Sequence, residues 1–239
     1  MHRRPEFARI RTALSRSAHF RMLEAAHLDA LAELCHLRRL RDGAPAGSVG
    51  RPLNELLVVL SGGLRLGGVT ASGREFVYAL LGPGSFYGLG YIIQGSASIA
   101  DAHAHGDTEL AVVKGDRLLA LLDAQPGLWR HVCHLLTHRL TLAMSVIRDL
   151  SLAPLRQRIA QRLLGQAMSS GGAVEAAGPF EVRVTQTDLG RMLGASRSKV
   201  NAELKRLEQG GMLKLSYRSI TLLDTRRLQE LAGPDVFAF

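Results

Sequence analysis

The sequence contains very little cysteine. Cys35 and Cys133 are the only two cysteines among 239 residues. Two cysteines are too few for a disulfide framework, and they lack the spacing of a zinc or iron–sulfur site. A reducing compartment suits such a sequence, so we expect a cytoplasmic protein.

Long apolar runs and catalytic motifs are also missing. The longest apolar runs, such as Leu56 to Leu60, fall far short of the roughly 20 residues that cross a bilayer, and the N-terminus is charged rather than apolar. The sequence has no phosphate-cradling Gly-x-x-x-x-Gly-Lys segment, no Ser/His/Asp arrangement and no paired-histidine metal motif. We therefore expect no membrane association, no metal site and no enzyme activity.

Basic residues outnumber acidic ones. Thirty Lys and Arg against 21 Asp and Glu give a formal net charge of +9, which favours an anionic partner such as nucleic acid. A basic enzyme with a merely solvated surface is the alternative. The length is enough for two domains with separate cores.

The N-terminal half changes from a helical to a strand-rich pattern. Apolar residues from Phe7 to about Leu40 follow helical spacing. From Asn54 to Val113 short β-rich runs alternate with glycine turns, including one predicted at Gly67 and Gly68, which indicates a small antiparallel sandwich or roll. The predicted strands are Leu56–Leu60, Leu64–Leu66, Phe76–Leu81 and Leu110–Val113.

A long helix is predicted after Pro126. Its apolar residues alternate in steps of four and three, as in a coiled-coil seam. So narrow a seam suits pairing with an identical helix, although packing on the preceding β-domain is an alternative and both can hold. Pro154 interrupts the helix and marks a hinge. The predicted dimerisation residues are Trp129, Cys133, Leu136, Leu140, Ala143, Ile147 and Leu150.

The segment from Thr185 to Leu213 has the pattern of a helix-turn-helix. Thr185 and Asp188 can cap a first helix, Gly194 can end it in the left-handed conformation, and Ser196 can cap a second helix. Upstream we predict a helix, a loop from Ser169 to Pro179 and a short strand. Two further strands after the second helix make a wing.

The start of the second helix carries the residues expected to read DNA. Arg197 can bond guanine O6 and N7 together, Asn201 can read adenine or bond a phosphate, and Lys199 and Lys205 suit the DNA backbone. Arg218 lies near the wing tip. The expected DNA-contacting residues are Thr185, Gln186, Ser196, Arg197, Ser198, Lys199, Asn201, Lys205 and Arg218.

These motifs together resemble the bacterial CRP/FNR family (cyclic-AMP receptor protein and fumarate-nitrate regulator) over nearly the whole chain. The matching pieces are Leu60-Ser-Gly-Gly, Leu81-Gly-Pro-Gly-Ser-Phe-Tyr-Gly88, the long helix ending before Pro154, and Gly194-Ala-Ser-Arg-Ser-Lys-Val-Asn201. The resemblance implies an α+β protein with a cyclic-nucleotide-binding-type, jelly-roll-like β-roll over residues 1–125. A dimerising helix over 126–153 and a winged helix-turn-helix over 154–239 follow. It also implies a homodimer on inverted-repeat DNA, often recruiting RNA polymerase.

The chain departs from the family pattern at the nucleotide pocket. Leu89 stands where nucleotide-binding members have a ribose-binding glutamate, and Gly95 to His103 contains Asp101 but no arginine for the phosphate. Burying an anion without a cation is costly, so we expect no cyclic AMP binding in the usual manner. A pocket for an unidentified effector, or for none, is placed at Phe86, Gly88, Leu89, Ser96 and Ser98.

Two alternatives stay open from the sequence. No cofactor is expected, but haem is a less favoured alternative because histidine is a common axial ligand. The histidines near the presumed pocket and long helix are His103, His105, His131, His134 and His138. A ligand-sensing module whose C-terminal domain contacts a protein partner competes with the DNA-binding hypothesis.

Overall fold

The computed structural model describes residues 3–169 and 179–233. The chain divides into two compact units. The first comprises mainly residues 3–68 and 80–139, and the second comprises residues 69–79, 140–168 and 179–233.

The first unit begins with two helices and a strand. Helices α1 (Arg3–Arg16) and α2 (Ala25–Leu34) precede strand β1 (His36–Leu40). The expectation of helix as far as Leu40 is therefore wrong for the last five residues. All five pair antiparallel with strand β8 (Thr108–Lys114), and this long-range pairing overrides the local helical spacing.

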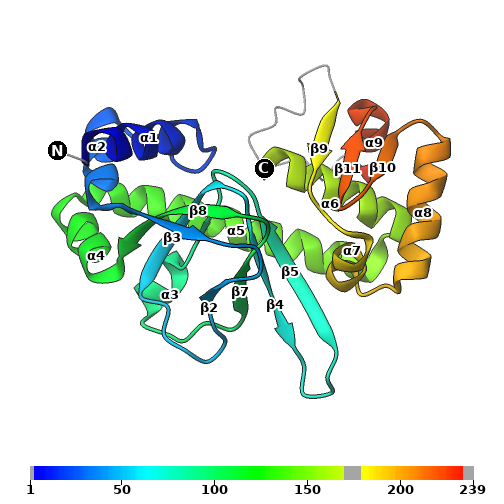
Figure 1. Ribbon diagram of the computed structural model, residues 1–239, viewed down its shortest axis with the longest axis horizontal. Helices are drawn as coiled ribbons and strands as arrows, with labels where there is room; N and C mark the ends of the chain where they lie inside the picture. The colour runs from blue at the N-terminus through cyan, green and yellow to red at the C-terminus, as the bar shows by residue number, and fades with distance from the viewer. Residues whose placement is uncertain (1–2, 170–178, 234–239) are drawn as a thin grey trace. The chain divides into compact units, whose positions relative to one another are not determined.

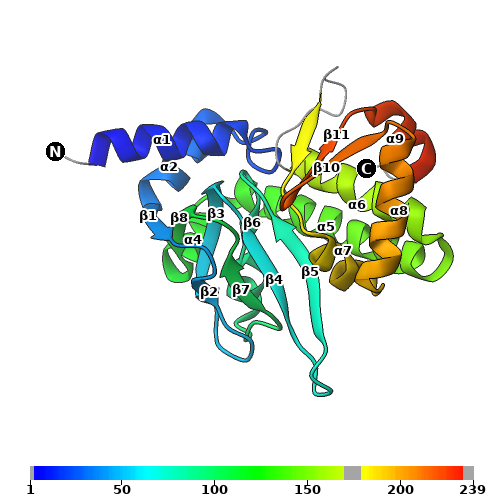
Figure 2. The ribbon, with the colours of Figure 1, turned by 45° about the vertical axis from the view of Figure 1, so that its right-hand side comes forward.

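Two four-stranded antiparallel sheets form the β-roll. One has the order β1-β8-β3-β6 and the other β2-β7-β4-β5, as Figures 1 and 2 show. Gly67 and Gly68 lie inside β4 rather than in the predicted turn. The further strands are β2 (Pro45–Gly47), β3 (Glu55–Ser61), β4 (Leu64–Val69), β5 (Glu75–Leu81), β6 (Phe86–Tyr87) and β7 (Asp101–Ala104).

Helix α3 (Leu89–Gln94) lies between β6 and β7 in the chain, and helices α4 (Gly115–Ala124) and α5 (Pro126–Leu152) follow β8. The first part of α5 buries Leu128, Val132 and Leu135 in the core that α1, α2, β3 and β6 also supply. The first part of the long helix therefore packs on the β-domain, which is the alternative to pairing with an identical helix that the sequence left open.

The second unit contains a winged helix fold. Helix α6 buries Ile159, Leu163 and Leu164 completely, and a three-stranded sheet with the order β10-β11-β9 completes the wing. Most of the loop predicted at Ser169 to Pro179 lies outside the described residues. The elements are α6 (Leu155–Ser169), β9 (Phe180–Val182), α7 (Gln186–Leu193), α8 (Arg197–Gln209), β10 (Leu213–Ser216), β11 (Ser219–Leu222) and α9 (Thr225–Ala232).

Together these units confirm the predicted α+β class, with a roll, a long helix and a winged helix-turn-helix in that order. Among the described residues, no helix combines the length and apolar character needed to cross a membrane.

Candidate nucleic-acid interface

Helix α7 begins at a reciprocal cap, as the sequence predicts. The Asp188 backbone N–H donates to Thr185 Oγ1 at 3.0 Å, and the Thr185 hydroxyl donates to Asp188 Oδ2 at 2.7 Å. This bonding satisfies one N–H group of the first turn and places a carboxylate at the positive end of the helix. The Thr185 hydroxyl is thus engaged inside the protein.

The turn between α7 and α8 depends on two glycines. Gly194 ends α7 with φ 61°, the left-handed conformation expected from the sequence. Gly190 was not singled out by the sequence analysis, yet a Cβ there would lie 2.7 Å from the Ala195 carbonyl oxygen. The lack of a side chain at Gly190 therefore allows the backbone that enters α8 to approach α7 closely.

Helix α8 exposes a short polar segment at its N-terminal end. Ser196 caps the helix by accepting from the Lys199 backbone N–H at 3.4 Å, a long bond. The buried face is apolar, with Val200 and Leu204 inaccessible to solvent. Arg197, Ser198, Lys199 and Lys205 are exposed, and Asn201 is half-buried. A first turn of this kind matches the part of a recognition helix that reaches base edges.

Some polar side chains at α8 are hydrogen-bonded within the second unit, and others are exposed. Ser196 Oγ and Ser198 Oγ lie 3.1 Å apart, so the Ser198 hydroxyl takes part in the cap. Glu203 accepts from Arg156 Nε of α6 at 2.6 Å and also pairs with Arg206. Arg197 and Lys199 are the exposed cationic residues in the first turn of α8.

The Glu203 carboxylate is a structural feature that the sequence analysis missed. The hydrogen bond from Arg156, assisted by Arg206, lowers the pKa of this carboxyl below its usual range, although burial acts in the opposite direction. The carboxylate thereby ties α8 to α6 in its charged form. Its spacing of three residues from Arg206 was visible in the sequence, but its long-range partner was not.

The remaining predicted contact residues lie outside α8. Gln186 is the first residue of α7 and is half-buried, like Thr185. Arg218 is exposed in the loop between β10 and β11. Figure 1 shows α7, α8 and the wing strands in the second unit.

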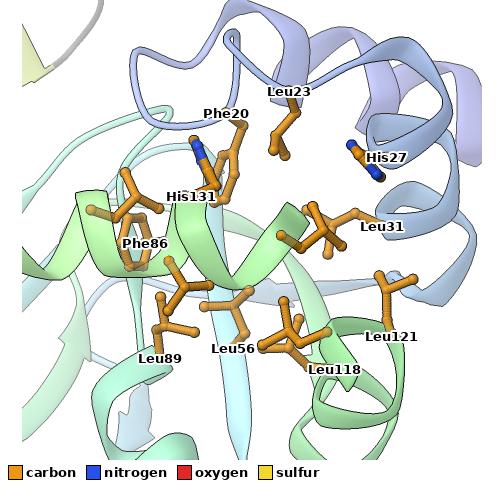
Figure 3. Close-up of a pocket in the computed structure, with 14 residues that line it drawn as sticks. Phe20, Leu23, His27, Leu31, Leu56, Phe86, Leu89, Leu118, Leu121 and His131 are labelled. Atoms are coloured by element: carbon orange, nitrogen blue, oxygen red, sulfur yellow. The ribbon is translucent and has the colours of Figure 1, made fainter. Parts of the chain in front are cut away.

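Two of the five predicted effector residues, Phe86 and Leu89, line one cavity in the first unit, and the other three are not among its lining residues. This cavity measures about 40 Å³, and its other walls come from α2, α4, α5 and β3 (Figure 3). Small-molecule pockets usually measure roughly 300 Å³ or more, so this cavity has no room for a nucleotide as it stands. The lining residues are Phe20, Leu23, His27, Leu31, Leu56, Phe86, Leu89, Leu118, Leu121, Leu122, Leu128, His131, Val132 and Leu135.

Ser96, Ser98 and Gly88 are held in local structure instead. The Ser98 hydroxyl is buried, lies 2.7 Å from Tyr87 Oη and donates to the Ala100 carbonyl. Ser96 donates to the Gln94 side chain. Gly88 has φ 106°, and a Cβ there would lie 2.1 Å from the Glu55 carbonyl oxygen. The absence of a side chain at Gly88 therefore allows its backbone to approach the backbone of Glu55 closely.

Asp101 also has a partner within the roll. Its Oδ1 accepts from the Val49 backbone N–H at 2.9 Å, next to the pairing of β2 with β7. This carboxylate stabilises the loop that follows β2. The stretch from Gly95 to His103, which contains no arginine, thus contains a structural acid.

The histidines that the structure describes are not grouped as metal ligands. His131 Nε2 lies 2.8 Å from the His19 carbonyl oxygen, and burial lowers the pKa of His131. Within residues 3–169 and 179–233, no group of three or more His, Cys, Asp or Glu side chains is placed to hold a metal ion. His103 lies in β7 and His105 directly follows it, whereas His134 and His138 lie in α5.

The predicted dimerisation seam divides along α5. Trp129 and Leu136 pack against the core of the first unit, and Cys133 is exposed. Leu140 and Ile147 are 61% and 64% exposed, respectively. The later part of the seam therefore presents large apolar side chains to solvent, an arrangement that is costly unless another surface covers it. Ala143 and Leu150 are exposed in the same stretch.

A cyclic-nucleotide-type roll followed by a capped helix pair with a wing defines a class of DNA-binding regulator. Comparisons with known proteins agree: a Crp-like helix-turn-helix domain matches residues 157–231, and a cyclic nucleotide-binding domain matches residues 37–125. The chain belongs to the CRP/FNR family of transcription regulators, and is accordingly a DNA-binding regulator rather than an enzyme.

Individual relatives cover most of the chain. The cyclic AMP receptor protein of Thermus thermophilus is 30% identical over 177 residues, which span 74% of this chain and 79% of the relative. The CRP-like cAMP-activated global transcriptional regulator of Mycobacterium tuberculosis is 24% identical over 219 residues, 92% of this chain and 98% of the relative. The structure of FixK2 from Bradyrhizobium japonicum shares the fold, with a TM-score of 0.74 at 22% identity over 84% of this chain and 98% of that one.

Family membership decides between the two functional hypotheses left open by the sequence. DNA binding is the shared activity of the relatives' class, so the hypothesis of a C-terminal domain devoted to a protein partner loses its support.

Proposed function

We propose that the protein acts as a homodimer on an inverted-repeat operator, with the N-terminal turn of α8 reading each half-site. The observation that carries this proposal is the exposed Arg197 and Lys199 at the start of a helix whose cap and turn are fixed by Ser196 and Gly194. Two-fold symmetry places the half-sites about one helical turn, roughly 34 Å, apart.

We propose that three consecutive segments of the chain carry out sensing, dimerisation and DNA binding. Residues 1–125 form the sensor, residues 126–153 form the dimerisation helix, and residues 154–239 form the DNA-binding domain. The exposed apolar residues of α5, such as Leu140 and Ile147, support pairing with a second copy of the helix. We place the dimer in the cytoplasm, where RNA polymerase is the partner proposed for the DNA-bound form.

We also propose that cyclic AMP does not control this regulator in the usual manner. Leu89 lies in an apolar cavity, Asp101 is committed to Val49, and no arginine occurs between Gly95 and His103. A cyclic phosphate buried there would lose its hydration without gaining a cation. Isothermal titration calorimetry is the test, and micromolar binding of cyclic AMP would overturn this part of the proposal.

Selection from a randomised DNA library by the purified dimer, at physiological salt, tests DNA recognition. We expect enrichment of one inverted repeat. Arg197→Lys keeps the charge but loses the bidentate fork, so it should reduce discrimination at one base pair by about 1 to 3 kcal/mol. Lys205→Gln is the matched control, because loss of a backbone contact weakens all sequences alike. Binding without any sequence preference would contradict the proposal.

A further inference from the structure

The wing ends in a loop that is unusual for its position. Strands β10 and β11 pair as far as Ser216 and Ser219, which leaves Tyr217 and Arg218 as a two-residue connection. Connections of this length favour Gly and Asn because they require positive φ angles. Arg218 has φ 58° and is the only non-glycine residue with positive φ among the described residues. The turn thus keeps a long cationic side chain where a smaller residue fits with less strain.

The neighbouring side chain is equally unusual. Tyr217 is 92% exposed, more than any other large hydrophobic side chain in the described parts of the chain. An aromatic ring normally packs its apolar body against other groups and leaves only its hydroxyl in water. An exposed aromatic beside an exposed arginine is a combination typical of binding surfaces.

The hairpin that carries the wing tip is hydrogen-bonded to the end of α8. The Leu215 backbone N–H donates to Glu208 Oε1 of α8 at 2.8 Å, and the Met212 N–H donates to the Leu207 carbonyl at 3.0 Å. Leu213 is buried at the base of the hairpin. These bonds lie within one compact unit and join the hairpin to the C-terminal end of α8, so the wing and α8 belong to the same DNA-binding unit.

We propose that the wing tip reads the minor groove of A·T-rich DNA flanking each half-site, with Arg218 entering the groove and Tyr217 packing on the adjacent sugar–phosphate backbone. The inference rests on the proposed function and extends recognition from the base pairs facing α8 to those beside them. A narrow minor groove concentrates negative potential and attracts arginine, and A·T tracts are narrow. Lys214, also exposed on β10, adds positive charge beside the tip.

The test compares operators that share one half-site core and differ only in their flanks. Fluorescence anisotropy measures binding of the full-length dimer to duplexes with A-tract flanks and with G·C flanks. We expect the wild-type protein to prefer the A-tract flanks by about fivefold or more. A duplex with a scrambled core tests the underlying operator recognition separately.

Two variants assign the preference to the tip. Arg218→Asn keeps a residue that tolerates positive φ but removes the cation, so it should abolish the flank preference and retain the preference for the core. Lys214→Gln removes one cation from the same hairpin and should weaken binding to both flanks equally. Thermal unfolding of Arg218→Asn should give the same Tm as the wild type or a higher one, which excludes misfolding as the cause.

The outcomes separate this inference from the function on which it rests. If the wild type recognises the core but ignores the flanks, or if Arg218→Asn keeps the flank preference, the minor-groove role is wrong. If Arg218→Asn weakens both flanks equally, Arg218 contacts phosphates only, and the inference is also overturned. If the scrambled core binds as well as the intact one, the proposed operator recognition itself fails.

Discussion

Protonation of His19 should make the first unit less stable in acid. The imidazole packs edge-on against Phe86, with ring centroids 5.2 Å apart. Burial, followed by the positive charge of Arg139 and by the neighbouring His138 and His131, lowers the pKa of His19 from 6.5 to about 4. The folded protein therefore holds the neutral ring.

The size and sign of the effect follow from proton linkage. The unfolded chain binds the proton near pH 6.5 and the folded chain only near pH 4, so the unfolded state carries more protons between these values. The free energy of unfolding is then highest above pH 6.5 and falls as the pH drops towards 4. From about pH 7.5 to about pH 5, a single group with these pKa values costs about 2 kcal/mol. Residual contact of His19 with solvent makes this figure an upper bound.

Urea unfolding followed by the fluorescence of Trp129, the only tryptophan, measures this change in the first unit. The wild type should lose stability between the two pH values, and His19→Gln, which cannot take up the proton, should lose less by the amount assigned to His19. His36→Gln changes an exposed histidine on β1 and serves as the control. An equal loss in wild type and His19→Gln would refute the reasoning.

Three further changes test other contacts. Gly190→Ala would place a Cβ 2.7 Å from the Ala195 carbonyl, so the winged helix should lose roughly 1 to 3 kcal/mol in denaturant titration; unchanged stability would contradict the close approach. Ile147→Asp puts a charge on a side chain that is 64% exposed, and sedimentation should show folded monomers, whereas intact dimers would count against the seam. Glu203→Gln removes the pairing with Arg156 and should lower Tm by a few degrees for about 1 kcal/mol; an unaltered Tm would show the tie to be unimportant.

Local patterns explain why the winged helix was predictable from the sequence. The caps at Thr185 and Ser196 and the turn at Gly194 depend on residues within a few positions of one another. Such interactions leave a direct signature in the chain. Two contacts in this unit were not predicted from the sequence. They are the close approach of Gly190 to the Ala195 carbonyl and the hydrogen bond between Arg156 and Glu203.

The roll was harder to predict because distant segments determine it. Strand β1 was interpreted as helix, since its residues gain their hydrogen bonds only from β8, about 70 positions later. The short strands β2, β6 and β7 carry no alternation long enough to be recognised. The pocket predicted at Phe86, Gly88, Leu89, Ser96 and Ser98 stays a prediction, because sequence proximity to the pocket motif does not show which way each side chain points.

The contacts around Phe86 limit how the sensor can work. Arg139 is the cation beside this ring, with its guanidinium carbon 3.8 Å from the ring centroid, and it donates to the Phe86 carbonyl at 2.7 Å. That charge is already committed to holding α5 on the roll within the first unit. The fourteen residues that line the cavity next to Phe86 include neither lysine nor arginine, so a phosphate placed there would have to break the Arg139 contacts or remain unpaired. Both alternatives are costly, and an effector that entered this cavity would have to gain its binding energy from apolar burial.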